Sequence, residues 1–227
     1  MNAPVRLLQT PRHRFTPEEA LILRKAGIVP PENKVALVDG MLVSEEAQPF
    51  RFTLDEVFHM VELGVLDPDA RVELIDGELV EMSPQNAPHM EAKRYLLTLF
   101  VRQLADDVAV QVEGSLRLAP RVSPSPDIWL HSTAIRVDHA RGPDVLLLVE
   151  VADSSLLRDL NLKAELYARH GVPDYWVVDA YGRRIFVHRQ PTPEGYAEVL
   201  EIGRETGIAP LAFPELVIRP GDLPVID

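Results

Sequence analysis

The residues best placed for chemistry in this 227-residue chain stand at the end of an apolar run. The apolar stretch 145–149 leads directly into Glu150, after Gly142-Pro143 and before a polar cluster at 153–155. An apolar run bounded by turn signals predicts a β-strand that is covered on both faces. Glu150 then lies at the carboxyl end of that strand, where open α/β sheets bind their ligands.

A helix predicted after this strand can return a lysine towards Glu150. Asp159, Lys163 and Tyr167 follow at intervals of four residues and therefore share one stripe of the helix. In a purely structural interpretation, Asp159 and Lys163 form an ordinary surface ion pair one turn apart. In a functional interpretation, Lys163 pairs with Glu150. The predicted cap and apolar face of the helix comprise Ser154 or Ser155, Leu156, Leu157, Leu160, Ala164 and Tyr167.

A second carboxylate, Asp127, follows Pro126 and precedes the short apolar run 128–130. A Pro-Asp pair alone is a common turn signal. It gains weight here because the strand that ends in Glu150 comes next along the chain. The sequence therefore predicts that Asp127 and Glu150 stand at the ends of adjacent strands.

Three residues compete to be the third polar group of such a site. Glu73 lies in a predicted strand and faces opposite to its apolar neighbours, so it serves either the site or a solvated surface. His89 and Glu91 occupy the first turn of a helix predicted from about 88 to 105, where a histidine is more often a surface residue than a ligand. The pattern alone leaves all three open.

Composition limits the chemistry that is available. The chain has no cysteine, which excludes disulfides, thiolate zinc sites and a cysteine nucleophile. A metal would be held by carboxylates, histidine or backbone oxygens, which favours Mg²⁺ or Mn²⁺. Neither a long apolar span nor a charged-then-apolar leader occurs, so we expect a cytoplasmic protein with no membrane partner.

The net charge of −12 argues against a protein that coats nucleic acid non-specifically. The acidity is concentrated, because residues 51–91 carry ten acidic and two basic side chains. Residues 92–189, which hold the candidate site, carry thirteen bases and twelve acids. This near-neutral half can still approach a polyanion.

The N-terminal part contains an internal repeat, in which residues 14–43 recur as 51–80 at a constant offset of 37. Twelve of the thirty aligned positions are identical. Each copy opens with a Thr-x-x-Glu capping box that predicts a short helix, and each ends with an Asp-Gly pair that predicts a hairpin. The copies differ where Ala36 corresponds to Glu73, so only the second copy can supply an acid.

Taken in order, these features resemble the Uma-two family of restriction endonucleases, within the PD-(D/E)XK nuclease superfamily. The resemblance covers about residues 51–205 and implies an α/β restriction-endonuclease-like core, with a central mixed β-sheet flanked by helices. It implies a nuclease-like domain over 49–227 with its core at about 86–190, preceded by the duplicated helix-hairpin arm 1–48. The motifs that carry it are 71–84, His89, Pro126-Asp127, 148–155, Asp159 with Lys163, and 167–179.

The resemblance also implies roles for the candidate residues. Asp127, Glu150 and the carbonyl of Val151 would hold Mg²⁺ or Mn²⁺, and the catalytic lysine would stand beside them. A literal Glu-x-Lys motif needs lysine at 152, where this chain has Ala152. The resemblance suggests that the amine has moved to Lys163, with Glu73 favoured as the third polar group and His89 second.

The expected function is therefore metal-dependent hydrolysis of DNA phosphodiester bonds. Two alternatives stay open: a catalytically silent interaction protein that keeps the nuclease fold, and a metal-dependent hydrolase of another phosphoester. We also expect a homodimer, because the extra hairpins offer edges that can pair with another chain and nucleases that cut both strands are commonly two-fold symmetric.

Overall fold

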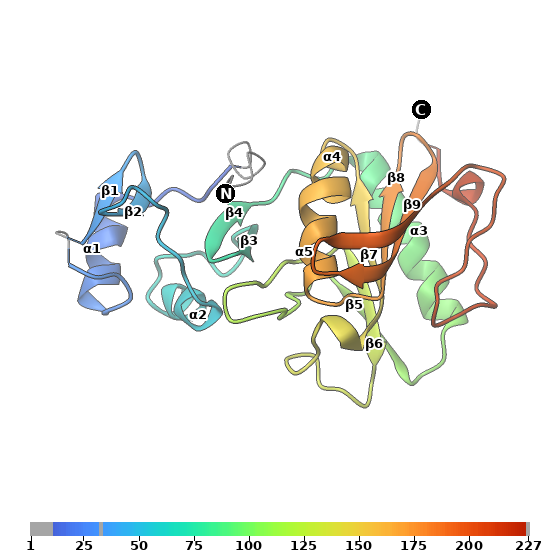
Figure 1. The fold of residues 1–227 in the computed structure, drawn as a ribbon, viewed down its shortest axis with the longest axis horizontal. Coiled ribbons are helices and arrows are strands. Elements are labelled where there is room, and N and C mark those ends of the chain that lie inside the picture. Colours follow the sequence, from blue (N-terminus) through green and yellow to red (C-terminus); the bar gives the residue numbers. More distant parts are fainter. Residues whose placement is uncertain (1–10, 32–33, 226–227) are drawn as a thin grey trace. The chain divides into compact units, whose positions relative to one another are not determined.

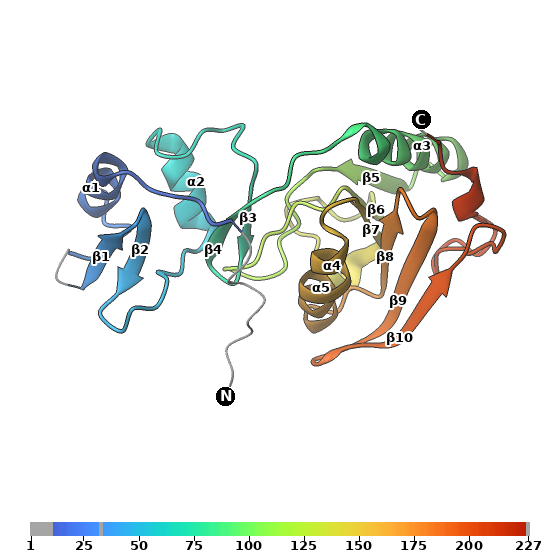
Figure 2. The ribbon, with the colours of Figure 1, turned by 90° about the horizontal axis from the view of Figure 1, so that it is seen from above.

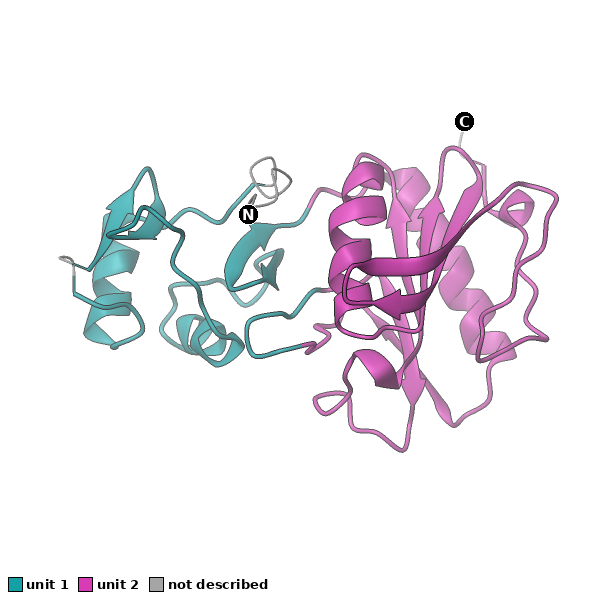
Figure 3. Ribbon diagram, viewed as in Figure 1, with its two compact units in different colours: residues 1–82, 119–124 teal, residues 83–118, 125–227 magenta. Residues whose placement is uncertain are grey.

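The computed structural model of the chain describes residues 11–31 and 34–225. The chain forms two compact units: unit 1 comprises residues 1–82 and 119–124, and unit 2 comprises residues 83–118 and 125–227 (Figure 3). The sequence placed a boundary after residue 48, between the two copies of the repeat. In the structure both copies lie in unit 1, because they share one hydrophobic core.

Unit 1 contains two helix-hairpin modules with the same plan (Figure 1). Thr16 and Thr53 accept hydrogen bonds from the backbone N–H of Glu19 and Glu56, whose side chains bond back to the caps, so both predicted capping boxes are confirmed. The modules consist of α1 (Pro17–Lys25), β1 (Val35–Val38) and β2 (Met41–Ser44), followed by α2 (Leu54–Glu62), β3 (Val72–Ile75) and β4 (Glu78–Glu81).

Both predicted Asp-Gly hairpins are also confirmed. Asp39 and Gly40 have φ values of 48° and 77°, and Asp76 and Gly77 have 49° and 83°. Positive φ at both central residues of a two-residue loop defines the type I′ turn that suits the twist of a hairpin. Register in each hairpin is consequently the same at equivalent positions.

Unit 2 is built around a six-stranded mixed sheet in the order β10-β9-β8-β7-β6-β5. Strands β7 and β8 are parallel, and the other neighbours are antiparallel. The predicted mixed sheet flanked by helices is thus confirmed. Its elements are α3 (Ala87–Gln103), β5 (Val108–Val112), β6 (Ile128–Ser132), β7 (Val145–Ala152), α4 (Leu156–Arg158), a π-helical turn (Asp159–Lys163), α5 (Ala164–Arg169), β8 (Asp174–Asp179), β9 (Arg184–Thr192) and β10 (Gly195–Ile202).

The sheet of unit 2 separates two helical layers (Figure 2). On one face, α3 buries Leu96 and Phe100 in a core that includes Val149 and Val151 of β7. On the other face, the ring of Tyr167 from α5 lies 4.8 Å from the ring of Tyr175 in β8. Strand β7 is therefore covered on both faces, as its apolar run predicted. None of the helices among the described residues is long and apolar enough to cross a membrane.

Two local predictions differ from the structure. The loosely alternating pattern of residues 108–118 predicts a strand over that range, but the strand ends at Val112, because the following Glu113 has a φ of 51°, outside the β region. The serine cap predicted after β7 is also wrong. Ser155 has helical backbone angles and makes no capping hydrogen bond; its hydroxyl instead donates to the carboxylate of Asp159 at 2.6 Å.

Candidate active site

Glu150 of β7 is held by two side chains from the helical segment that follows the strand. The Nζ atom of Lys163 lies 2.8 Å from Oε1 of Glu150, and the hydroxyl of Tyr167 donates to the same oxygen at 2.7 Å. The Glu150 and Lys163 residues are 4% and 3% exposed. Sequence reasoning predicted this return of Lys163 to Glu150. The alternative of a surface Asp159–Lys163 pair is wrong, because both residues are buried.

A π-helical turn carries the two buried charged residues of this segment, Asp159 and Lys163. The turn runs from Asp159 to Lys163, between the short α4 and α5. Single π-turns inside α-helices often mark functional sites, because the wider turn shifts the direction in which side chains project. The hydroxyl of Tyr175 donates to the carbonyl of Asp159 at 3.1 Å and so ties the turn to the sheet.

Asp127 stands directly before β6, opposite Glu150. The β6–β7 register pairs Ile128 with Val149, and one further step brings Asp127 opposite Glu150. Neighbouring residues in that position have Cα atoms about 4.5–5.5 Å apart. The register of the sheet therefore places the two acids at the ends of adjacent strands, as the sequence predicted.

Several donors surround the Asp127 carboxylate. Its Oδ2 accepts from the backbone N–H of Val151 at 2.8 Å and lies 3.1 Å from Nε2 of His89, while Oδ1 accepts from Gln85 at 3.2 Å. Burial raises the pKa of Asp127. This effect is outweighed by the hydrogen bond and charge of His89, the hydrogen bond from the Val151 N–H and the charge of Lys163, so the pKa of Asp127 lies below its ordinary value. Asp127 is therefore held as a carboxylate.

The N-terminus of α3 positions His89. Asn86 caps the helix by accepting from the backbone N–H of His89 at 3.1 Å, and its amide donates to Asp153 beyond β7. Nδ1 of His89 is buried and has no hydrogen-bond partner in the described part of the chain. Glu91, the third candidate, instead forms an ion pair with Arg94 on the exposed side of the helix.

Sequence reasoning missed a second group of polar residues beside Asp127. Lys93 lies one turn after His89 on α3, with Nζ 3.9 Å from Oδ1 of Asp127. The same amine donates to Oε1 of Gln85 at 2.9 Å and to the carboxylate of Glu113. The only local signal was the four-residue spacing of His89 and Lys93, which places both on one face of a helix.

Glu73 belongs to unit 1, where it lies on β3 opposite Val80 and is 1% exposed. The interpretation of Glu73 as a solvated surface residue is therefore wrong. A buried carboxylate is rare without a specific role or partner. Its assignment to the site stays a prediction.

The donor set around β6 and β7 fits a hard divalent cation. Two carboxylates at the ends of neighbouring strands supply the oxygen ligands that Mg²⁺ prefers, and Mg²⁺ is commonly held by only one or two carboxylates together with waters. Among the described residues there is no group of three His, Cys, Asp or Glu side chains that could hold a metal ion. A cation here would therefore depend on Asp127, Glu150, backbone oxygen and water.

The fold and this site together define a nuclease-like α/β core. The family model described as "Putative restriction endonuclease", that of Uma2, matches residues 54–223. The chain therefore belongs to the Uma2 family, as the motifs predicted. The matched region includes residues 54–80 of the second copy of the repeat and none of the first copy.

A solved structure shows the same fold. The chain is similar to the crystal structure of "a putative nuclease belonging to DUF820" from Anabaena variabilis, with a TM-score of 0.60 and 15% sequence identity. The similarity covers 75% of this chain and 96% of that chain. No curated protein matches the chain.

Proposed function

We propose that this chain is an endonuclease that hydrolyses DNA phosphodiester bonds with Mg²⁺ or Mn²⁺ held by Asp127, Glu150 and the carbonyl of Val151. The observation that carries the proposal is the buried Lys163–Glu150 pair, 2.8 Å apart at the carboxyl end of β7 and opposite Asp127. Membership of a restriction endonuclease family supports the choice of substrate. We further propose a cytoplasmic homodimer, so that two such sites can act on the two strands of a duplex.

Each residue has a distinct task in this proposal. A cation held by Asp127, Glu150 and the carbonyl of Val151 would polarise a phosphodiester oxygen and lower the pKa of a bound water. Lys163 orients the attacking water and offsets the negative charge that develops on the phosphate. Tyr167 fixes the Glu150 carboxylate, and His89 fixes that of Asp127, as hydrogen-bonded neighbours of metal ligands commonly do. Glu73 is proposed as a further acid of the site.

Cleavage of supercoiled, linear and single-stranded DNA with Mg²⁺ or Mn²⁺ tests the proposal. Glu150→Gln keeps the size of the side chain but removes a negative ligand, so it should abolish cleavage and the rise in melting temperature that Mn²⁺ gives the wild type. Glu73→Gln should reduce cleavage. Ala36→Glu, the equivalent position in the first copy, is its matched control and should leave cleavage unchanged.

Three results would count against this function. If Glu150→Gln melts and shifts with Mn²⁺ as the wild type does, the metal site is elsewhere. Normal metal binding without cleavage of any DNA form would favour an interaction protein with a nuclease fold. Cleavage of nucleotides or other phosphoesters but not of DNA would favour a different metal-dependent hydrolase.

A further inference from the structure

In unit 1, the segment that precedes each copy of the repeat pairs with the second hairpin strand of the other copy. The backbone N–H of His13 donates to the carbonyl of Leu79 at 2.9 Å, and that of Phe50 donates to the carbonyl of Leu42 at 2.8 Å. Both the donors and the acceptors of these two bonds are related by the repeat offset of 37. The bridges Arg12↔Val80 and Pro49↔Val43 repeat the relation.

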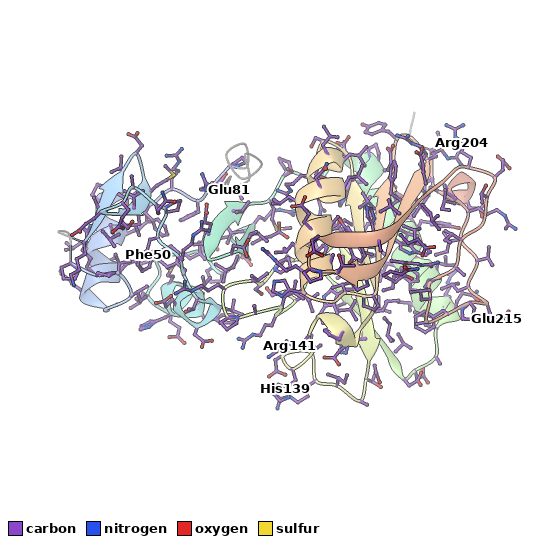
Figure 4. The ribbon with its side chains drawn as sticks, viewed as in Figure 1. Phe50, Glu81, His139, Arg141, Arg204 and Glu215 are labelled. Atoms are coloured by element: carbon purple, nitrogen blue, oxygen red, sulfur yellow. The ribbon has the colours of Figure 1, made fainter. Side chains whose placement is uncertain are left out.

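This exchange makes unit 1 a pseudo-two-fold pair within one chain. The rings of Phe15 and Phe52, equivalent residues that follow Arg14 and Arg51, meet at 5.8 Å. Phe50, labelled in Figure 4, packs its ring against Phe52 at 4.9 Å. The outer edges of β2 and β4 are therefore both occupied from within the chain.

The outer edge of β3 is also occupied. Leu74 exchanges two backbone hydrogen bonds with Ser123, of 3.2 and 2.8 Å, and the N–H of Gly77 donates to the carbonyl of Arg121 at 2.7 Å. The second copy thus binds a strand at the outer edge of β3 through an antiparallel pair of residues that exchange two backbone hydrogen bonds. Ile75 beside it is only 2% exposed.

The equivalent edge of β1 is open in the described part of the chain. Leu37 pairs with Leu42, one step from the type I′ turn, and a pair in that position is not hydrogen-bonded. The N–H and C=O of Leu37 therefore point away from β2. No described residue pairs with those two groups. Val38, the equivalent of Ile75, is 48% exposed, and Ala36 is also exposed.

The first copy is not suited to a segment like 119–124. In the second copy, the N–H of Leu54 donates to the carbonyl of Pro120 at 2.8 Å and anchors that segment. The equivalent residue in the first copy is Pro17, which has no N–H to donate. The occupant of the β1 edge must therefore be held by Leu37 and its neighbours alone.

A second copy of this chain meets that requirement. When Leu37 pairs with the partner's Leu37, each N–H donates to the other C=O, and an antiparallel pair of identical residues is two-fold symmetric by construction. The same register places exposed Ala36 opposite the partner's Val38. We propose that two copies of this chain associate through antiparallel pairing of their β1 edges, centred on Leu37.

This inference rests on the homodimer proposed above and names its interface. Its test measures molar mass and not activity, so its result is independent of the nuclease assignment. Sedimentation of the full chain over a range of concentrations should show a reversible dimer. Leu37→Pro removes the outward N–H at an edge position where proline is tolerated and should leave a monomer. Val38→Lys should do the same, because an edge lysine resists pairing.

The control and the rescue separate pairing from misfolding. Leu21→Lys changes a residue of α1 that is 48% exposed, like Val38, and should leave the dimer intact. Ala36→Glu combined with Val38→Lys places opposite charges across the two-fold axis and should restore the dimer that Val38→Lys alone loses. The changes at Ala36 and Val38 affect exposed side chains and keep the core that the two copies share, which deletion of residues 1–48 would remove.

A wild-type chain that stays monomeric at all concentrations would overturn the proposal, as would a dimer that survives both Leu37→Pro and Val38→Lys. Failure of the double substitution to restore the dimer would also overturn it. A synthetic peptide of residues 118–125 provides the remaining test. The peptide should leave the dimer intact, because Pro17 lacks the N–H that anchors this segment in the second copy. Dissociation of the dimer by the peptide would overturn the choice of a second β1 as the preferred occupant of the edge.

Discussion

At the scale of single residues, the pairing of Glu150 with Lys163 is hard to explain by stability alone. A buried ion pair is often no more stabilising than apolar residues of similar volume, whereas removal of one partner leaves an uncompensated buried charge. Both residues lie in the sheet-to-helix layer, where Leu148 and Tyr167 are fully buried. The charges at this position therefore point to the chemistry proposed for the site.

This pairing predicts a strongly non-additive mutant cycle. Lys163→Met keeps the apolar stem but leaves the Glu150 charge buried, so it should lower the free energy of unfolding by about 3–5 kcal/mol in metal-free buffer. Lys163→Met combined with Glu150→Gln should cost clearly less than the sum of the single changes. Urea unfolding of the four proteins measures the coupling.

Lys25→Met provides the control, because Lys25 is exposed on α1 and its loss should change the free energy of unfolding by less than about 0.5 kcal/mol. Additive single and double effects at Lys163 and Glu150 would contradict the pairing seen in the structure.

How far the site could be predicted depended on whether its signals were local. Asp127 and Glu150 stood out because each adjoins an apolar run, and Lys163 because it lies on the helix predicted after one of those runs. Gln85 and Glu113 gave no such signal, because they meet Asp127 only after 42 residues of chain in one case and across the β5–β6 pair in the other. Their contacts are set by the packing of α3 and by sheet register, which no short window of sequence contains.

At the scale of elements, the capping boxes and type I′ hairpins were predictable because their residues satisfy their own backbone within a few positions. The π-helical turn at Asp159–Lys163 was not. Its sequence has ordinary helical spacing. The wider turn accompanies the contact of Lys163 with Glu150 of β7 and the hydrogen bond from Tyr175 of β8 to the carbonyl of Asp159. The element that carries Lys163 is thus shaped by tertiary packing.

The hairpin turn of the second copy lies so close to the segment before α2 that Gly77 has no space for a side chain. Gly77 has a φ of +83°, and an added Cβ would lie 2.9 Å from Cβ of Arg51 and 3.1 Å from the carbonyl oxygen of Phe52. Gly64 has a similar φ of +68° but nothing within 4 Å.

Gly77→Ala should therefore destabilise unit 1 by more than the roughly 1–2 kcal/mol expected from a left-handed backbone alone, whereas Gly64→Ala should show that backbone cost only. Chemical denaturation of both variants measures the difference. Equal losses would show that the turn can move away from Arg51 without penalty.

At the scale of the whole molecule, the sequence predicted the central sheet but not how the chain divides. Residues 119–124 leave unit 2 after Leu118 and add to the edge of β3, in a unit whose other residues end at Met82. The sequence does not show that residues 119–124 belong to unit 1, because the bridge Leu74↔Ser123 joins residues far apart in sequence. The repeat likewise predicted two similar modules, whereas their reciprocal exchange required the structure.

The stability of the molecule should fall as the solution becomes mildly acidic, in part through His188. This residue of β9 is 3% exposed, its ring lies 5.2 Å from that of Tyr175 and 5.6 Å from that of Tyr196, and its Nδ1 has no hydrogen-bond partner in the described part of the chain. Burial lowers the pKa of His188 below 6.5, against backbone contacts with Tyr175 and Phe186 that raise it.

The unfolded chain therefore binds a proton at His188 before the folded chain does, so the free energy of unfolding should decrease as pH falls below about 6.5 and level off below the folded pKa. One proton contributes a slope of at most about 1.4 kcal/mol per pH unit. His188→Phe keeps the aromatic packing and should make the measured slope between pH 5 and 7 shallower by up to that amount. His139→Phe, at an exposed histidine, should leave the slope unchanged. A slope that is the same in the wild type and in His188→Phe would show that His188 takes up its proton in the folded state as readily as in the unfolded chain.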